Sequence, residues 1–504
     1  MKARLIIVLL SGLLFSIQLT AQTTNISGVV NTYYSVVEII PAKACIRLNT
    51  TSGLSPSETI MLIQMKGASV LTANNNTFGD TTSLNNAGNY ELNTICGMRG
   101  DSVFLFYNIL NNYTISGKVQ LVGIPTYYSA VVTDTLKALP WNNATGTGGV
   151  IALDIDQNLT LNAPISADNS GFSGGAYVVS SGTCSNASPA NGYIYNASTT
   201  NPQSGAFKGE SVFEVTPAQS GGRGAVANGG GGGNNHNNSG GGGANLTAGG
   251  DGGGNSSTKG CLANLNGLKG KALSSWNGKK IFSGGGGGAG HSDANSTPTY
   301  GGGNGGGIIF VRAKNLISNN SKISANGQLG GPTLSDGASG GGGGGTIIAD
   351  IENYSGTLAI EAKGGNGGAE NDGLNIKYCY GAGGGGSGGV IYLSGGLPPA
   401  TLAITGGLAG AETGRDPACN AIIPAVAGST GVTVTNYSYA SSVIPANYCT
   451  AIALPVGITY FKALLNKQKV LLQWNKSEHQ FPFLPYRYMK QQMKLHLKEQ
   501  IFTG

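Results

Sequence analysis

Two pairs of carboxylates stand at corresponding positions of a segment that recurs along the chain. Asp154 and Asp156 lie two residues apart in the first copy, and Asp350 and Glu352 hold the matching positions of the third. Alternate residues of a β-strand point to the same face, so each pair would share an outward face. Glycosidases work with paired carboxylates in a cleft. A carbohydrate-binding or carbohydrate-active protein is therefore one hypothesis.

The other two copies of the segment argue against a catalytic pair. The second copy has Arg312 and Lys314 at the matching positions, and the fourth has Ser394 and Gly396. A solvated strand face of mixed charge explains this pattern without catalysis, and a fold by itself does not specify a reaction. We favour the solvated face and assign no catalytic residue.

The hydrolase pattern G-x-S-x-G occurs around Ser173, Ser339 and Ser387. In a hydrolase this motif forms a strained turn from a strand into a helix, with a His and an Asp or Glu supplied elsewhere. No helical pattern follows any of these serines, and a chain so rich in glycine produces the motif by chance. We expect no nucleophile here.

The sequence lacks the residue spacings that are usual in metal-binding and nucleotide-binding sites. His236 and His291 lie in glycine-rich stretches and belong to no H-E-x-x-H pair. The segment GGNGGAEND approaches the calcium-binding nonapeptide, but Ala369 replaces its aspartate, which leaves at most a weak site at Glu370 and Asp372. No Gly-Lys pair is followed by the Ser or Thr of a phosphate loop. We predict no metal and no cofactor.

The recurring segment predicts the elements that carry these residues. Residues 148–167 recur without gaps as residues 306–325, and looser copies begin at Gly344 and Gly388. Apolar residues alternate strictly within the copies, which is typical of a strand with one buried face. In the first copy the predicted core positions are Ile151, Leu153, Ile155, Leu159, Leu161, Ala163, Ile165 and Ala167. In the second they are Ile309, Val311, Ala313, Ile317, Ile323 and Ala325, with Arg312, Lys314, Ser318, Asn320, Lys322 and Ser324 facing water.

One such unit cannot bury its apolar face alone, and repeat proteins solve this by stacking units. We therefore predict a parallel β-helix or β-solenoid. Glycine-rich insertions separate the units and should be loops on one edge, either disordered or tightly packed backbone. A collagen helix is excluded because runs such as residues 284–288 break the Gly-X-Y period.

The whole chain is predicted to be all-β. Lys2 and Arg4 precede a short apolar run, the layout of a secretory signal peptide, and no later run is long enough to span a bilayer. Export permits disulfides. The 7 cysteines form no C-x-x-C pair, and their odd number leaves at least one thiol unpaired. The sequence leaves open which cysteines are joined. The predicted parts are a signal peptide (1–21), an N-terminal β domain (22–140), a glycine-rich β-solenoid (141–450), a partial fibronectin-like module (451–478) and an atypical basic tail (479–504).

The formal net charge of +6 does not indicate a nucleic-acid partner. The excess of Lys and Arg lies in the first few residues and beyond residue 461, and the body between is nearly balanced. A nucleic-acid binder needs a clustered basic face. We exclude nucleic acid and expect surface polysaccharide or other cell-surface polymers as partners.

Several motifs carry a family resemblance. They are IMLIQMKGA at 60–68, NNAGNYE at 85–91, the repeat start GGVIALDI, and LPV followed by LLQW near the C-terminus. With these the chain resembles glycine-rich exported surface proteins of Gram-negative bacteria that use type IX secretion. The resemblance covers most of the chain. It implies a cell-surface location without a defined reaction.

The chain departs from this family after Glu478, where no sorting domain is recognisable. A frameshift near codon 479 is one interpretation. The other is a real amphipathic helix, with Met489, Met493, Leu497 and Ile501 at helical spacing. We favour the truncation.

The sequence thus predicts an adhesin-like or structural protein without catalytic activity, with a carbohydrate-binding or carbohydrate-active protein as the alternative. The expected location is secreted or at the outer cell surface, or periplasmic if the sorting domain is absent.

Overall fold

The computed structural model describes most of the chain between residues 23 and 476. The described residues are 23–179, 192–195, 205–234, 237–255, 265–273, 279–293, 301–371, 380–413, 423–439, 441, 443–446, 458–466 and 469–476. They form strands and short 3-10 turns and contain no α-helix, which confirms the all-β prediction. No helix in this part is long and apolar enough to cross a membrane. The predicted signal peptide (1–21) and basic tail (479–504) lie outside it.

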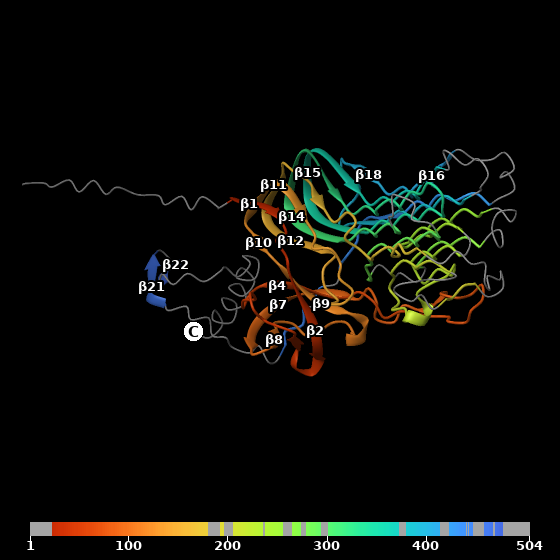
Figure 1. Cartoon of the computed structure of the whole chain (residues 1–504). Coiled ribbons are helices and arrows are strands. Elements are labelled where there is room, and N and C mark those ends of the chain that lie inside the picture. Colours follow the sequence, from red (N-terminus) through yellow and green to blue (C-terminus); the bar gives the residue numbers. More distant parts are fainter. Residues whose placement is uncertain are drawn as a thin grey trace, which may run out of the picture.

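The first body is a closed antiparallel barrel (Figure 1). Its strands, in barrel order, are β2 (Thr32–Ile40), β3 (Cys45–Leu48), β8 (Ser102–Leu105), β7 (Tyr90–Arg99), β4 (Thr59–Gln64) and β9 (Val119–Ile124). Strand β4 is apolar on both faces, because Ile60 and Leu62 fill the barrel while Met61 and Ile63 join a second core outside it. The short strands β5 (Ser69–Val70) and β6 (Thr81–Ser83) pair with each other beside the barrel's sheets. Cys45 is a free buried thiol, and Cys96 is disulfide-bonded.

The second body is a sheet of parallel strands in which the repeat copies stack directly on one another. Ile151, Ile309, Ile347 and Ile391 are consecutive partners across it. Its strands are β1 (Thr23–Gly28), β10 (Thr126–Tyr127), β11 (Ser129–Lys137), β12 (Val150–Leu161), β13 (Ile165–Ser166), β14 (Ile308–Ser324), β15 (Thr346–Glu361), β17 (Val390–Leu393), β18 (Thr401–Ala403) and β20 (Val432–Val434). Strands β1 and β11 belong to this sheet, although both lie within residues 22–140.

One face of the sheet encloses the core that the alternation predicted. All the predicted positions of the first copy are buried there, except that Ala163 is partly buried against it. In the second copy Leu316 is buried and Ile317 is only half-buried, so the prediction for Ile317 is wrong. The register shifts between Ile155 and Asn158, which brings Leu159 opposite Leu316. A bulge therefore breaks the ungapped alignment.

The opposite face was predicted to meet water, and at the start of each copy this is wrong. These positions are buried against Met61 and Ile63 of the barrel. They include Val150, Ala152, Ile308, Phe310, Ile348, Val390 and Tyr392. Ser318 and Ser324 are also buried, whereas Lys314 is exposed. Continuous apolar runs are typical of parallel strands buried on both faces, and the openings of the copies (VIAL, IIFV, TIIA, VIYL) are such runs.

The glycine-rich insertions are a third body, which we call the glycine bundle (residues 171–179, 205–255, 265–271, 283–293, 301–307, 325–345, 362–370, 381–389, 405–412 and 423–431, as far as described). In Figure 1 its extended segments run side by side from the sheet toward the right of the view. The N–H groups of residues 337–345 donate to the segments 285–291, 381–387 and 325–331 in strict rotation, at 2.8–3.0 Å. Each of these three neighbouring segments thus accepts a hydrogen bond from every third residue of 337–345. A period of three without internal hydrogen bonds is that of a polyproline II-type helix.

The bundle needs glycine because its backbones approach too closely for a side chain. A Cβ atom placed on Gly340 would lie 2.0 Å from the carbonyl oxygen of Gly241, and one on Gly287 would lie 2.1 Å from that of Gly340. At the margin of the bundle Asn366 is exposed, and its side-chain oxygen accepts the N–H of Leu408. The glycine-rich insertions that were predicted as loops are therefore packed backbone. The sequence left open whether they are disordered or tightly packed, and the structure shows the packed form.

Smaller elements complete the described fold. The 3-10 turns are η1 (Pro41–Lys43), η2 (Ile115–Gly117) and η3 (Pro217–Gln219), and the parallel pair β16 (Glu370–Asn371) and β19 (Glu412–Thr413) ends two bundle segments. Near the C-terminus β21 (Ile458–Asn466) and β22 (Lys469–Lys476) form an antiparallel pair, within the predicted partial module.

Candidate functional site

The predicted carboxylates are brought together, but as part of a ladder of opposite charges. Asp154, Arg312 and Asp350 are consecutive partners across β12, β14 and β15. Arg312 Nε donates to Asp154 Oδ1 at 2.7 Å, and Arg312 Nη2 donates to Asp154 Oδ2. Arg312 Nη1 also donates to the hydroxyl of Tyr439 at 3.3 Å. Both oxygens of Asp154 are therefore engaged by one guanidinium.

This pairing determines what Asp154 can do. Asp154 is only 6% exposed, so a substrate has little access to its carboxylate. Burial acts to lower the pKa of Arg312, but the hydrogen bonds and charge of Asp154 raise it overall, so the guanidinium stays charged. Asp156 and Glu352 are exposed at the surface, and Asp350 is half-buried.

The serines of the G-x-S-x-G motifs lie in the glycine bundle and form no nucleophile elbow. Ser339 and Ser387 are buried, and Ser339 Oγ accepts the N–H of Gly290 at 3.0 Å. The Ser173 N–H donates to Glu210 at 2.9 Å. No helix follows any of them among the described residues.

The remaining predicted ligand positions are separated or outside the described part. His291 is buried, and its Nδ1 lies 3.3 Å from the N–H of Asn237. Glu370 is buried in β16, while His236 and Asp372 lie outside the described residues. Within the described ranges no three His, Cys, Asp or Glu side chains gather closely enough to hold a metal ion.

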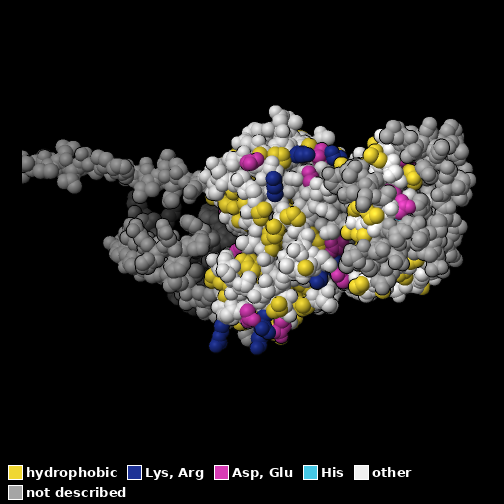
Figure 2. All heavy atoms as spheres, in the orientation of Figure 1, with side chains coloured by type: hydrophobic (Ala, Val, Ile, Leu, Met, Phe, Trp, Pro, Cys, Tyr) yellow, Lys and Arg dark blue, Asp and Glu magenta, His cyan; other side chains and the backbone are white. Residues whose placement is uncertain are grey.

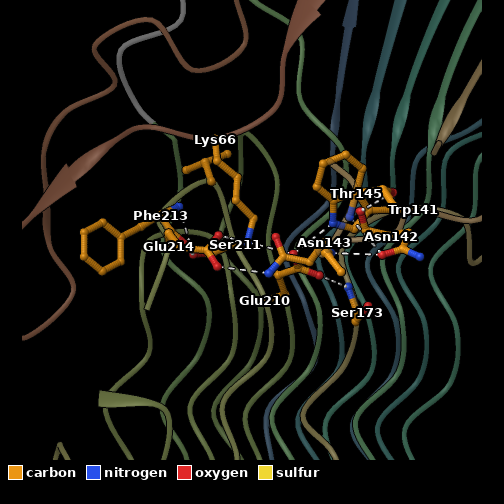
Figure 3. A network of polar contacts seen from close by, with 12 residues as sticks. Lys66, Trp141, Asn142, Asn143, Thr145, Ser173, Glu210, Ser211, Phe213 and Glu214 are labelled. Atoms are coloured by element: carbon orange, nitrogen blue, oxygen red, sulfur yellow. Dashed lines mark hydrogen bonds and ion pairs between the residues drawn. The ribbon is translucent and has the colours of Figure 1, made fainter. Parts of the chain in front are cut away.

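A polar network that the sequence did not reveal connects the three bodies (Figure 3). Lys66 Nζ lies 2.7 Å from Glu210 Oε1 and 2.7 Å from Glu214 Oε2. Trp141 Nε1 donates to Glu210 Oε1 at 2.8 Å, and Asn143 Nδ2 donates to Glu214 Oε1 at 2.9 Å. Lys66 follows the barrel strand β4, Trp141 and Asn143 lie between β11 and β12, and the two glutamates belong to the glycine bundle. We call this set the junction network.

The junction network is largely removed from water. Lys66 is 2% exposed and lies 5.7 Å above the ring of Phe172, which meets Trp141 edge-on at 5.9 Å. The side chain of Glu214 remains 48% exposed. Burial acts to raise the pKa of Glu214, but hydrogen bonds from Lys66 and Asn143 lower it overall. One buried ammonium therefore faces two carboxylates, one of which reaches the surface.

The junction network was missed because its members are far apart in sequence and carry no motif. Lys66 lies in a loop, and Glu210 and Glu214 lie in a stretch predicted only as an insertion. The one available signal was the rarity of charge, since only 10% of the residues are charged. Two glutamates four residues apart inside a glycine-rich stretch were therefore unusual.

A second buried lysine has a different environment. Lys208 Nζ donates to the carbonyl oxygens of Tyr193 and Gly222 at 2.6 and 2.7 Å and lies 5.1 Å above the ring of Phe78. Within the described part of the chain no carboxylate pairs with it. Burial lowers its pKa well below the usual value for lysine.

Comparison with known proteins gives little further information. No family model matches the chain, and no curated protein matches it. Among solved structures, a match is found to the Gp54 tailspike of Acinetobacter baumannii bacteriophage AP22, solved in complex with A. baumannii capsular saccharide. The match has 10% identity and a TM-score of 0.14, and it covers 84% of this chain and 66% of the tailspike chain. A TM-score this low does not establish a shared fold.

Proposed function

We propose that the protein is an exported, adhesin-like or structural protein without catalytic activity. Its parallel sheet and glycine bundle would act as a solenoid-type scaffold that makes extended contacts with polysaccharide or other cell-surface polymers. The observation that carries this proposal is the glycine bundle, an ordered array of backbone segments that pack too closely for side chains at most of their glycine positions. The outward carboxylates support it too, because Arg312 neutralises Asp154.

The proposal extends to location. An apolar run behind Lys2 and Arg4 supports export, and the motifs shared with glycine-rich type IX secretion proteins support the outer cell surface as the destination. Among the residues coloured in Figure 2, Lys and Arg side chains are scattered and form no broad basic patch of the kind that a nucleic-acid binder needs.

Incubation of the purified protein with a panel of bacterial capsular and cell-wall polysaccharides tests the proposal. We expect retention on at least one immobilised polymer and no release of reducing ends during prolonged incubation. Release of reducing sugar that is lost in an Asp350→Asn variant, and kept in a Lys314→Gln control on the same sheet face, would establish the carbohydrate-active alternative instead.

A further inference from the structure

In the junction network one carboxylate holds a lysine and an asparagine at the same time. Glu214 Oε2 binds Lys66 Nζ at 2.7 Å, and Glu214 Oε1 accepts from Asn143 Nδ2 at 2.9 Å. The two nitrogen groups therefore lie side by side on the two oxygens of a single carboxylate (Figure 3). An amine, a carboxamide and a group that carries protons between them are the components of an amide transfer.

A second observation concerns the carboxamide itself. Asn143 Oδ1 is buried and has no hydrogen-bond partner. An orphaned buried carbonyl costs free energy and calls for an explanation. Hydrolysis by water is disfavoured at this place because Lys66 is 2% exposed and is covered by Phe172 and Trp141. An amine and a carboxamide that are held on the same carboxylate can react with the large kinetic advantage of an intramolecular reaction.

We propose that Lys66 and Asn143 form an intramolecular isopeptide bond, with Glu214 carrying the proton. Lys66 Nζ gives a proton to Glu214 and attacks Asn143 Cγ, so that the Nζ–Cγ bond forms. Glu214 then gives this proton to Asn143 Nδ2, accepts a second proton from Nζ as the Cγ–Nδ2 bond breaks, and releases that second proton through its exposed side. Ammonia leaves, and the reaction needs no oxidant, reductant or metal. The ammonia can leave through the exposed side of Glu214.

The bond would join the barrel to the connection that leads into the parallel sheet. Lys66 directly follows β4, and Asn143 precedes β12, so the new link would bypass the chain between them. Glu210 accepts from Trp141 and from the Ser173 N–H, and so it fixes the aromatic cover without touching Asn143 in the described contacts. A covalent link at this point would hold the bodies together under load, which suits an adhesive or structural role.

Intact-mass measurement of the reduced, full-length secreted protein tests this inference. We expect a mass lower than that calculated from the sequence by one ammonia molecule. We also expect a proteolytic fragment in which the peptide containing Lys66 is joined to the peptide containing Asn143. Lys66→Arg, Asn143→Ala and Glu214→Gln should each restore the full mass, whereas a surface control, Lys363→Arg, should keep the loss.

Two results would overturn the inference. One is the full calculated mass for the wild-type protein, which decides the matter whether or not any variant folds. The other is an ammonia loss in Lys66→Arg as large as in wild type, because this would place the loss elsewhere, in a succinimide or in a cyclised N-terminal Gln22. The polysaccharide experiment is independent of both results, so failure here leaves the proposed function to be judged on its own test.

Discussion

Burying an ammonium group costs free energy unless a counter-charge or hydrogen bonds accompany it, and Lys66 and Lys208 meet this requirement differently. Lys66 has two carboxylates within 2.7 Å. Lys208 has carbonyl oxygens and an aromatic face instead. Both carbonyls also accept backbone N–H groups, from Gly224 and Gly232. Lys208 could therefore be replaced by an apolar residue without leaving an unpaired carbonyl.

This contrast makes a prediction about pH. Because burial lowers the pKa of Lys208, the unfolded chain binds its proton more readily than the folded protein does. The resulting loss of stability is at its full size when the pH is below the pKa of Lys208 in the folded protein. It becomes smaller as the pH rises toward about 10.4, the ordinary pKa of a lysine. Lys208→Met should therefore be more stable than wild type at pH 7, because the variant no longer has to bury a charged group.

Denaturant unfolding at pH 7 to 10 measures this difference. The stability gap between Lys208→Met and wild type should shrink as pH rises, and Lys363→Met, a change at a more exposed lysine, is measured beside it as a control. A variant less stable than wild type at every pH would mean that the carbonyl and ring contacts of Lys208 outweigh the cost of burying its charge.

At the scale of elements, the glycine bundle rests on the close approach of backbones. In a lattice where every N–H along residues 337–345 has a partner on a neighbouring segment, one misplaced backbone affects several others. A Cβ atom on Gly287 would meet backbone atoms of Gly340 and Gly341 within 2.1–2.8 Å, and these atoms cannot rotate away as a side chain could.

Gly287→Ala should consequently destabilise the protein by about 3 kcal/mol, the upper range for overpacking a dense interior. Gly395→Ala is the matched control, because nothing lies within 4 Å of its Cβ position. Unfolding midpoints in guanidinium chloride measure both. Equal midpoints for the two variants would contradict the packed arrangement of the bundle.

Sequence reasoning reached some of these elements and not others. The buried positions from Ile151 to Ala167 were predictable because alternation reports a face directly. The burial of Phe310 and Tyr392 on the opposite face was not, because it depends on the barrel that packs there. The bundle interior could not be read from an alternation of side chains, since most of its closely packed positions are glycines. Its margin did carry a signal, the G-G-x spacing of GGNGGAE, in which Asn366 is exposed.

The candidate site was less predictable than the fold. Asp154 and Asp350 were expected on one solvated strand face. They do lie in register, but Asp154 is buried, and only the stacking of β12, β14 and β15 shows that Arg312 lies between them. The junction network joins Lys66 to Glu214 across 148 positions of sequence. Contacts of such separation follow from the packing of the three bodies, which no local pattern specifies.

At the scale of the whole molecule, the barrel, the parallel sheet and the glycine bundle share cores and hydrogen bonds. The core outside the barrel combines Met61 and Ile63 of β4, Phe310 of β14 and Leu273 near the bundle. The backbone N–H groups of Gly67 and Ala68 both donate to Val212, at 2.9 and 3.2 Å. Such an arrangement would carry load through backbone contacts, which fits the structural or adhesive role proposed above.

The ordered glycine bundle is the central feature of this protein, and amide hydrogen exchange followed by mass spectrometry measures its order directly. The amides of residues 284–289, 337–345 and 383–389 donate to neighbouring segments, so they should exchange as slowly as those of strand β14, because such amides open only with cooperative unfolding. Exchange at the rate of an unstructured peptide in these segments, with β14 still protected, would contradict the account.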